Sequence, residues 1–120
     1  MDIKEGTEEI IVEYNYIDAR GISNANYADS FIDLKGTRAY IRYNTFVRHG
    51  ETKLTRGIAV IDRGVELSSY EHVIHDNEFY LDDDGSNIKM VDAYSGTTDV
   101  YAWNNVRHPS NGPAYSNSVN

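Results

Sequence analysis

The chain has 120 residues and a net charge of −8, and 40% of its residues are hydrophobic, which is the balance of a folded protein rather than a disordered one. The negative charge argues against nucleic acid as a partner, because phosphate recognition needs clustered Lys and Arg. The lack of cysteine excludes disulfides, zinc-thiolate sites and thiol catalysis.

No apolar run approaches the length that crosses a membrane, so we expect no membrane partner. The first residues contain no apolar region of the kind that defines a signal peptide. We therefore expect a cytosolic protein, a chain whose signal has been removed, or an excerpt from a longer protein.

Short segments rich in β-branched and aromatic residues recur along the chain at 12–17, 41–46, 74–79 and 101–106. Each contains an asparagine, and these recur at intervals of about 30 residues: Asn15, Asn44, Asn77 and Asn104. We expect asparagine at the bend between two strands, because it tolerates left-handed backbone geometry. Its amide can also hydrogen-bond to the next copy along a stack.

A second register of aspartates precedes these segments, and each aspartate is followed within a few residues by glycine. The aspartates also recur at intervals of about 30 residues: Asp2, Asp33, Asp62 and Asp92. Two registers with the same period establish that the sequence is repetitive.

Segments 31–35, 40–43 and 58–62 have the composition of short strands and are separated by Gly, Asn, Asp or Ser. No window keeps a 3.6-residue period with caps, which argues against helical repeats. Two or three short strands in each unit predict an all-β, right-handed parallel β-helix of about four coils. Residues 1–120 would form a single β-helix domain or a fragment of one. An antiparallel sandwich is the alternative.

Apolar residues on both sides of the asparagines should form two columns that face the core. The expected members are Val12, Ile41 and Ile74 in the first column, and Ile17, Phe46, Phe79 and Val106 in the second. Polar residues of the same segments should form an outward column: Glu13, Arg42 and His75. The polar stretches 18–30, 47–57, 80–90 and 107–120 are expected to be loops.

Stacked aspartates would lie about 4.8 Å apart from coil to coil and would repel one another unless a cation compensates their charge. One interpretation is a Ca²⁺ site with a neighbouring catalytic base, supplied by Lys35 or by Arg63. The other is a row of ordinary Asp–Lys surface pairs, each of which contributes little to stability.

The loop from His49 to Arg56 gathers basic groups beside the next aspartate strand. His49, Lys53 and Arg56 could bind an anionic sugar chain there, or they could belong to a solvated turn. The run 82–87 has part of the spacing of a calcium loop but lacks its final glutamate, so we interpret it as an acidic turn.

The segment from Asp29 to Thr37, followed by Tyr40 to Phe46 and then by His49 and Lys53, resembles a coil of the pectate lyase superfamily. The later segments 72–79 and 100–106 are similar to coils of those enzymes that end in Asn-x-Phe and Asn-Asn. The resemblance spans nearly the whole chain and is specific to the right-handed β-helix class. It is weaker for any one activity, since epimerases, hydrolases, phage tailspikes and adhesins share these motifs.

This resemblance implies Ca²⁺-dependent β-elimination of uronic-acid polymers, with Asp29, Asp33 and Asp62 as metal ligands and Lys35 as a substrate-binding or catalytic cation. It also implies a secreted or cell-surface protein. The arginine segment that supplies the base in the best-known pectate lyases has no clear counterpart. The repeat begins at the first residue, so the first coil looks uncapped, and its free sheet edges could support a homo-oligomer.

Two functions follow from these observations. The first is a carbohydrate-active β-helix that performs Ca²⁺-assisted β-elimination on an acidic polysaccharide. The second is a non-catalytic β-helix, part of an adhesin or tailspike, which binds polysaccharide through its Tyr-rich face.

Overall fold

The structure, a computed structural model of the chain, describes residues 1–23, 25, 28–64, 69–82, 88–94 and 97–120. Its first sheet contains β1 (Asp2–Ile3), β4 (Ser30–Leu34), β7 (Arg56–Val60) and β10 (Val91–Ala93). Its second contains β2 (Ile11–Glu13), β5 (Tyr40–Arg42), β8 (Tyr70–His75) and β11 (Thr98–Trp103). Its third contains β3 (Tyr16–Asp18), β6 (Thr45–Val47), β9 (Glu78–Tyr80) and β12 (Val106–His108).

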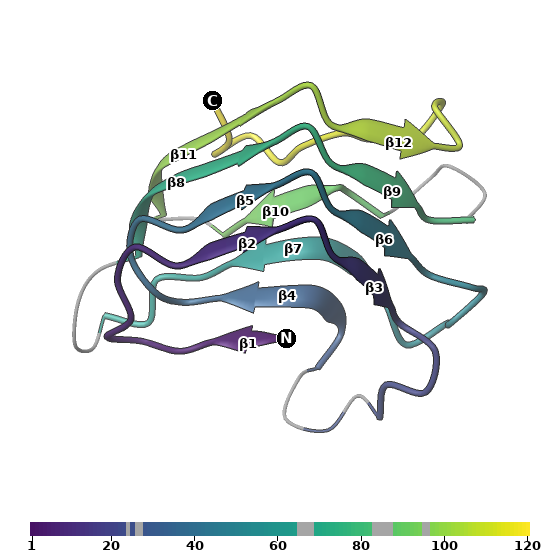
Figure 1. Cartoon of the computed structure of the whole chain (residues 1–120), viewed down its shortest axis with the longest axis horizontal. Helices are drawn as coiled ribbons and strands as arrows, with labels where there is room; N and C mark the ends of the chain where they lie inside the picture. The colour runs from purple at the N-terminus through teal and green to yellow at the C-terminus, as the bar shows by residue number, and fades with distance from the viewer. Residues whose placement is uncertain (24, 26–27, 65–68, 83–87, 95–96) are drawn as a thin grey trace.

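All neighbouring strands within the three sheets are parallel, and each coil of the chain contributes one strand to each sheet (Figure 1). The coils therefore stack along one axis, from β1 at the N-terminal end to β12 at the C-terminal end. The parallel β-helix predicted from the repeat is confirmed, and the antiparallel alternative is wrong. In the described part of the chain, no helix has the length and apolarity needed to cross a membrane.

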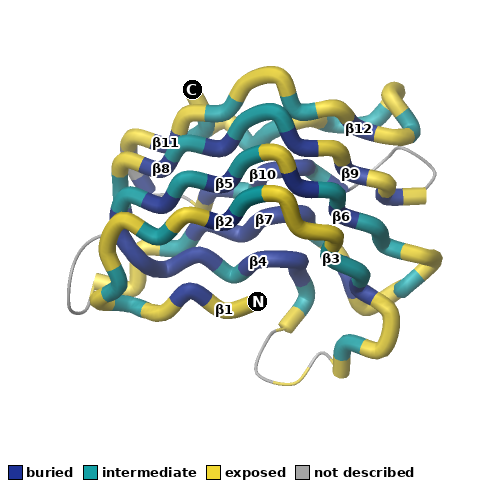
Figure 2. Tube along the Cα trace, viewed as in Figure 1, coloured by how far each residue is buried: buried dark blue, intermediate teal, exposed yellow. Residues whose placement is uncertain are grey.

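The core occupies the space between the sheets, where the inward residues of successive strands lie over one another (Figure 2). Val12, Ile41 and Ile74 pair across β2, β5 and β8 and are buried, as predicted. In the second column the rings of Phe46 and Phe79 stack with their centroids 4.6 Å apart. Like residues thus bury each other from coil to coil, and burial of each large apolar side chain contributes about 1.5–3 kcal/mol.

The asparagines form a hydrogen-bonded ladder along the axis. The side-chain oxygen of Asn44 accepts from the backbone N–H of Asn15 at 3.0 Å and from its side-chain amide at 3.1 Å. Asn77 accepts from Asn44 in the same way, with both distances at 3.0 Å. Each amide also donates to strand carbonyls, as Asn44 does to Val12 at 2.9 Å. The ladder therefore satisfies backbone groups that the bends would otherwise leave buried and unpaired.

The last member of this ladder is Asn105, so the prediction of Asn104 is wrong. Asn77 donates its backbone N–H to the side-chain oxygen of Asn105 at 3.1 Å, and Trp103 is the residue that pairs with His75. Asn104 instead has a φ of 53°. Its equivalents in the other coils also have positive φ: Tyr14, Tyr43 and Asp76. The left-handed bend thus falls on the residue before the ladder asparagine, contrary to the expectation from sequence.

The same shift by one residue turns Val106 outward, although it was predicted to face the core. Val106 is 46% exposed, whereas Arg107 pairs with Phe79 and is buried. The guanidinium of Arg107 donates to the carbonyl oxygens of Ile88 and Pro113. The second column therefore ends in a buried cation that holds backbone carbonyls.

The two ends of the solenoid differ. At the C-terminal end, Tyr115 forms a parallel bridge with Val91, and Val119 forms one with Val100. The strands β1, β2 and β3 lie at the ends of their sheets, with a neighbouring strand on one side only. The prediction that free coil edges support association therefore concerns the N-terminal edge, and it stays a prediction.

The aspartate row is interrupted in its third coil. Asp2 pairs with Asp33, but Asp33 pairs with Ala59, and Ala59 pairs with Asp92. Asp62 lies beyond the end of β7 and is exposed. The buried residues of this sheet set its register, since they must face the core together: Ile32, Ile58 and Val91. The placement of Asp62 in the stacked row is therefore wrong.

Candidate functional site

A groove with a volume of about 350 Å³ lies on the outer face of the first sheet. Its lining residues lie on β4 and β7 or in the chain next to β4, β7 and β10: Asp29, Asp33, Lys35, Arg56, Ala59, Ile61, Arg63 and Tyr94. Strand alternation turns Asp33 and Ala59 away from the core while Ile32 and Ile58 face it. Three successive coils thus contribute to one surface.

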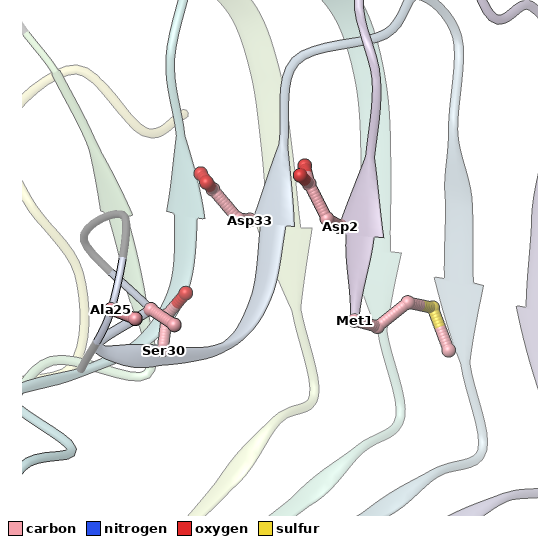
Figure 3. A pocket seen from close by; sticks show the side chains of 6 residues that line it. Met1, Asp2, Ala25, Ser30 and Asp33 are labelled. Atoms are coloured by element: carbon pink, nitrogen blue, oxygen red, sulfur yellow. The ribbon is translucent and has the colours of Figure 1, made fainter. Parts of the chain in front are cut away.

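A second hollow, of about 260 Å³, adjoins the groove and shares Asp33 with it. Its other lining residues come from the first two coils: Met1, Asp2, Ala25, Ala28 and Ser30. Figure 3 shows the carboxylates of Asp2 and Asp33 side by side on the neighbouring strands β1 and β4, pointing to the same side of the sheet.

The ammonium group of Lys35 is held by both of these carboxylates. Its Nζ lies 2.9 Å from Asp2 Oδ1 and 3.2 Å from Asp33 Oδ2, and the residue is buried. Burial by itself lowers the pKa of Lys35, but hydrogen bonds and the negative charges of Asp2 and Asp33 outweigh it and raise the pKa. Burial acts to raise the pKa of Asp2, but contacts with Lys4 and Lys35 lower it overall. Lys35 is therefore a fixed cation at neutral pH.

The guanidinium of Arg56 lies among two carboxylates and a phenol. Its Nε is 3.4 Å from Asp29 Oδ2 and its Nη1 is 3.8 Å from Asp92 Oδ2. Nη1 also donates a hydrogen bond to the hydroxyl of Tyr94, and the guanidinium lies 5.0 Å from the centre of the Tyr94 ring. Thr55 donates from its hydroxyl to Asp29 at 3.2 Å, which orients that carboxylate. Arg56 and Tyr94 thus form one positioned unit.

Two buried polar atoms beside the groove have no hydrogen-bond partner among the described residues: Asp33 Oδ1 and Arg56 Nε. The contact of Arg56 Nε with Asp29 is close enough for an ion pair, but it does not have the geometry of a hydrogen bond. A buried donor or acceptor that stays unpaired is costly. The groove therefore has one acceptor and one donor that a hydroxyl and a carboxylate of a ligand would satisfy.

The groove combines three cations with a hydroxyl that can transfer protons. Lys35 and Arg56 are held in place by carboxylates, whereas Arg63 forms no ion pair within the described part of the chain. Arg recognises a carboxylate by paired hydrogen bonds, and a Tyr hydroxyl can act as a general acid or base. Chemically, the site suits an anionic substrate from which a proton must be removed.

Most of the residues predicted from the sequence meet in this groove: Asp29, Asp33, Lys35, Arg56 and Arg63. Asp62 does not line it. Its carboxylate accepts the backbone N–H of Gly64 at 2.8 Å and so closes a local turn. The roles predicted for these residues stay predictions.

His49 and Lys53 do not line either hollow. They follow β6 of the third sheet, where His49 Nε2 lies 3.4 Å from Asp18 Oδ2 and 3.2 Å from the hydroxyl of Tyr16. Lys53 is exposed. Both residues belong to the connection between β6 and β7, whereas Arg56 is the first residue of β7 in the first sheet.

The acidic run 82–87 is described only at its first residue, and residues 83–87 lie outside the described part of the chain. Asp82 accepts a hydrogen bond from the backbone of Gly50 and forms an ion pair with Arg48 at 3.3 Å. The carboxylate of Asp82 thus ties two consecutive coils together.

Tyr94 was not predicted from the sequence, although a signal was present. The row that pairs Leu34, Val60 and Ala93 places the next residues, Lys35 and Tyr94, in equivalent positions of different coils. In sequence terms, Tyr94 follows Asp92 with the same spacing as Lys35 follows Asp33. Alignment of the two aspartates would have identified it.

The predicted calcium ligands do not fit a calcium ion. Among the described residues, no group of three or more His, Asp or Glu side chains is placed to hold a metal. Asp33 shares the ammonium of Lys35, Asp29 contacts Arg56, and Asp62 lies apart from both. Calcium takes six to eight oxygen ligands, so this set would be incomplete.

A buried Ser–His contact elsewhere is structural. His72 Nε2 lies 2.8 Å from Ser69 Oγ, and its Nδ1 accepts the backbone N–H of Ala39 at 3.2 Å. Nδ1 is therefore unprotonated, so Nε2 carries the hydrogen and cannot take one from the serine. Burial lowers the pKa of His72 to about 4. The pair cannot activate Ser69 as a nucleophile.

A comparison with solved structures identifies a similar chain, described as the crystal structure of an alginate lyase from Paenibacillus sp. str. FPU-7. The two chains superpose with a TM-score of 0.91 and are 38% identical, over 99% of this chain and 38% of that one. The chain thus spans well under half the length of that lyase. No protein-family model matches the chain, and neither does any curated protein sequence. The likeness supports a polysaccharide-lyase-like β-helix.

Proposed function

We propose that this chain binds an acidic polysaccharide along the groove of the first sheet and cleaves it by β-elimination. The observation that supports this most is the groove itself, which Lys35, Arg56 and Arg63 line together with Tyr94, whose hydroxyl accepts a hydrogen bond from Arg56. The likeness to an alginate lyase favours alginate as the polymer, and that choice is part of the proposal. Membership of the pectate lyase superfamily is proposed on the same grounds.

β-Elimination needs two things at a uronic acid residue. The carboxylate must be neutralised, because this makes the proton on C5 easier to remove, and a base must then accept that proton. Lys35 and Arg56 are the cations positioned to face the carboxylate. Arg63, at the exposed side of the groove, would bind a carboxylate of the neighbouring sugar.

Tyr94 is the proposed proton carrier. In its deprotonated form, with the guanidinium of Arg56 beside it, the oxygen of Tyr94 accepts the C5 proton. The C4–O bond then breaks as a double bond forms between C4 and C5. Tyr94 returns the proton to the departing oxygen, so its phenolate is regenerated. Lys35 is assigned to charge neutralisation because both of its partner carboxylates hold it as a cation.

A second candidate function is binding without cleavage. The fact that favours it is length: the chain spans 38% of the alginate lyase that it resembles, so part of a catalytic set could come from outside it. In that case the groove would still hold the polymer. We also propose that the protein acts outside the cell, where a polymeric substrate is found.

The test is to incubate the protein with polymannuronate, polyguluronate and polygalacturonate and to follow the ultraviolet absorbance of unsaturated uronides. We expect product with at least one alginate block, and strongly reduced product with Arg56→Ala. Arg42→Ala is the matched control, because Arg42 pairs with Glu13 at 2.7 Å on the second sheet. Absence of product from all three polymers, together with measurable binding, would favour the non-catalytic function.

A further inference from the structure

The carboxylate row of the first sheet contains its own cation. Asp2 and Asp33 pair across β1 and β4, and the ammonium of Lys35 lies 2.9 Å from one and 3.2 Å from the other. A second lysine, Lys4, lies 2.8 Å from Asp2 on the exposed side. Neighbouring strands are only about 4.8 Å apart, so without these cations the two carboxylates would repel each other.

This position is where a calcium ion would be expected on such a surface, since carboxylates from consecutive coils meet there. The part of the chain that the structure describes offers no third carboxylate to complete a ligand set. The next residue in the row is Ala59, which has no oxygen in its side chain. The carboxylate of Asp29 is engaged by Thr55 and Arg56 instead.

An ammonium group has three hydrogens, and two carboxylates account for two of them. Lys35 also lines the groove beside Arg56, although most of its side chain is buried. Its remaining hydrogen is thus available for an anionic group bound in the groove. A bound metal ion would likewise supply positive charge at this place.

We propose that Lys35 takes the place of a calcium ion, so that the charge on the substrate carboxylate is neutralised by an internal ammonium and the protein needs no divalent metal. This inference rests on the proposed function for its substrate, but the cation replacement can be measured without turnover. The opposing effects of burial and of two carboxylates on Lys35 leave its pKa raised, which keeps the ammonium charged.

The experiment compares thermal unfolding of the wild-type chain and of Lys35→Gln, each with EGTA and with an excess of CaCl₂. The wild type should unfold at the same temperature in both conditions. Lys35→Gln replaces the ammonium by an amide oxygen beside the Asp2 and Asp33 carboxylates. These oxygens, with water molecules, can bind calcium, so calcium should raise the unfolding temperature of this variant by about 4 °C or more. The double variant Asp2→Asn/Lys35→Gln should lose this gain, and Lys35→Arg should behave like the wild type.

Calorimetric titration with CaCl₂ provides a second readout, with no heat expected from the wild type and saturable binding expected from Lys35→Gln. Circular dichroism establishes that each variant is folded; should Lys35→Gln fail to fold, the wild type and Lys35→Arg still decide the matter. Binding of calcium to the wild type or to Lys35→Arg, or stabilisation of either protein by calcium, would overturn the inference. A folded Lys35→Gln that neither binds calcium nor is stabilised by it would also overturn the inference.

The inference and the proposed function can fail separately. If uronides form, EGTA should leave the wild-type rate unchanged, and a loss of activity in EGTA would refute the metal-free site. If no polymer is cleaved while the calcium responses are as expected, the cation replacement stands and the proposed lyase activity falls.

Discussion

The asparagine ladder allows one stability prediction to be worked out bond by bond. Asn77 is 1% exposed, and its side-chain oxygen accepts two hydrogen bonds from Asn44. Its amide donates to the carbonyls of Ile41 and His75 and to Asn105, at 2.9 to 3.0 Å. Asn77→Ala removes all five contacts and leaves buried groups of two neighbouring coils without partners.

At about 1 kcal/mol for each net hydrogen bond, with some loss shared among bifurcated contacts, we expect Asn77→Ala to cost about 3–4 kcal/mol. That is a large part of the 5–15 kcal/mol typical of a domain. Asn15→Ala is the matched control. Asn15 is exposed at the first coil, where its side chain donates to Glu13 and Asn44. Its removal should cost about 1 kcal/mol.

Urea unfolding followed by circular dichroism gives both free energies from the midpoint and the slope. Equal losses for the two variants would refute the reasoning, because the ladder would then contribute no more inside the solenoid than at its end. A loss below about 1 kcal/mol for Asn77→Ala would do the same.

Three further predictions concern acid stability, close packing and catalysis. Burial lowers the pKa of His72 from 6.5 to about 4. The contribution of neutral His72 to stability is therefore complete above pH 6.5 and should fall by about 3 kcal/mol as the pH drops towards 4. Unfolding free energies that do not change over this interval would contradict this prediction. Gly57→Ala would press a Cβ against the backbone carbonyl of Met90 and should lower the free energy of unfolding by about 2–3 kcal/mol. Gly21→Ala, at a positive φ but in open space, should lower it by about 1 kcal/mol. Denaturant midpoints of the two variants measure the difference. Tyr94→Phe keeps the ring beside Arg56 but removes the hydroxyl. Its kcat on the cleaved polymer should therefore fall by about 100-fold or more, while its unfolding temperature stays unchanged. Full activity would exclude Tyr94 as the proton carrier.

The sequence was sufficient to predict the β-helix because its repeat reflects a physical requirement of the fold. Successive coils must place like residues over one another, and Asn15, Asn44 and Asn77 do so. The fourth coil was placed one residue out of register because two asparagines, Asn104 and Asn105, are adjacent. The hydrogen bonds to Asn77 and the positive φ of Asn104 distinguish them.

Asp62 illustrates a related difficulty. It matched the period of the other aspartates, but the register of a parallel sheet is set by the residues that face the core. Ile58 is fixed opposite Ile32, and this places Ala59 beside Asp33. The regular spacing of the aspartates was therefore a weaker guide to the strand register than the apolar residues next to them.

Five of the predicted site residues meet in the groove because they lie on or next to β4 and β7, which are neighbours. His49 and Lys53 are close to Arg56 in sequence, but the chain leaves the third sheet before it reaches the first. Tyr94, which directly follows β10, completes the groove more than thirty residues after Arg56. Such a contact follows from the stacking of coils and not from local sequence.

The most direct test of the proposed function is an experimental structure of Tyr94→Phe bound to a short oligouronate. The sugar should lie along the outer face of the first sheet, with one carboxylate against Lys35 and Arg56. An oligouronate bound instead over the aromatic residues of the second sheet, or beside His49 and Lys53, would contradict the assignment of this groove.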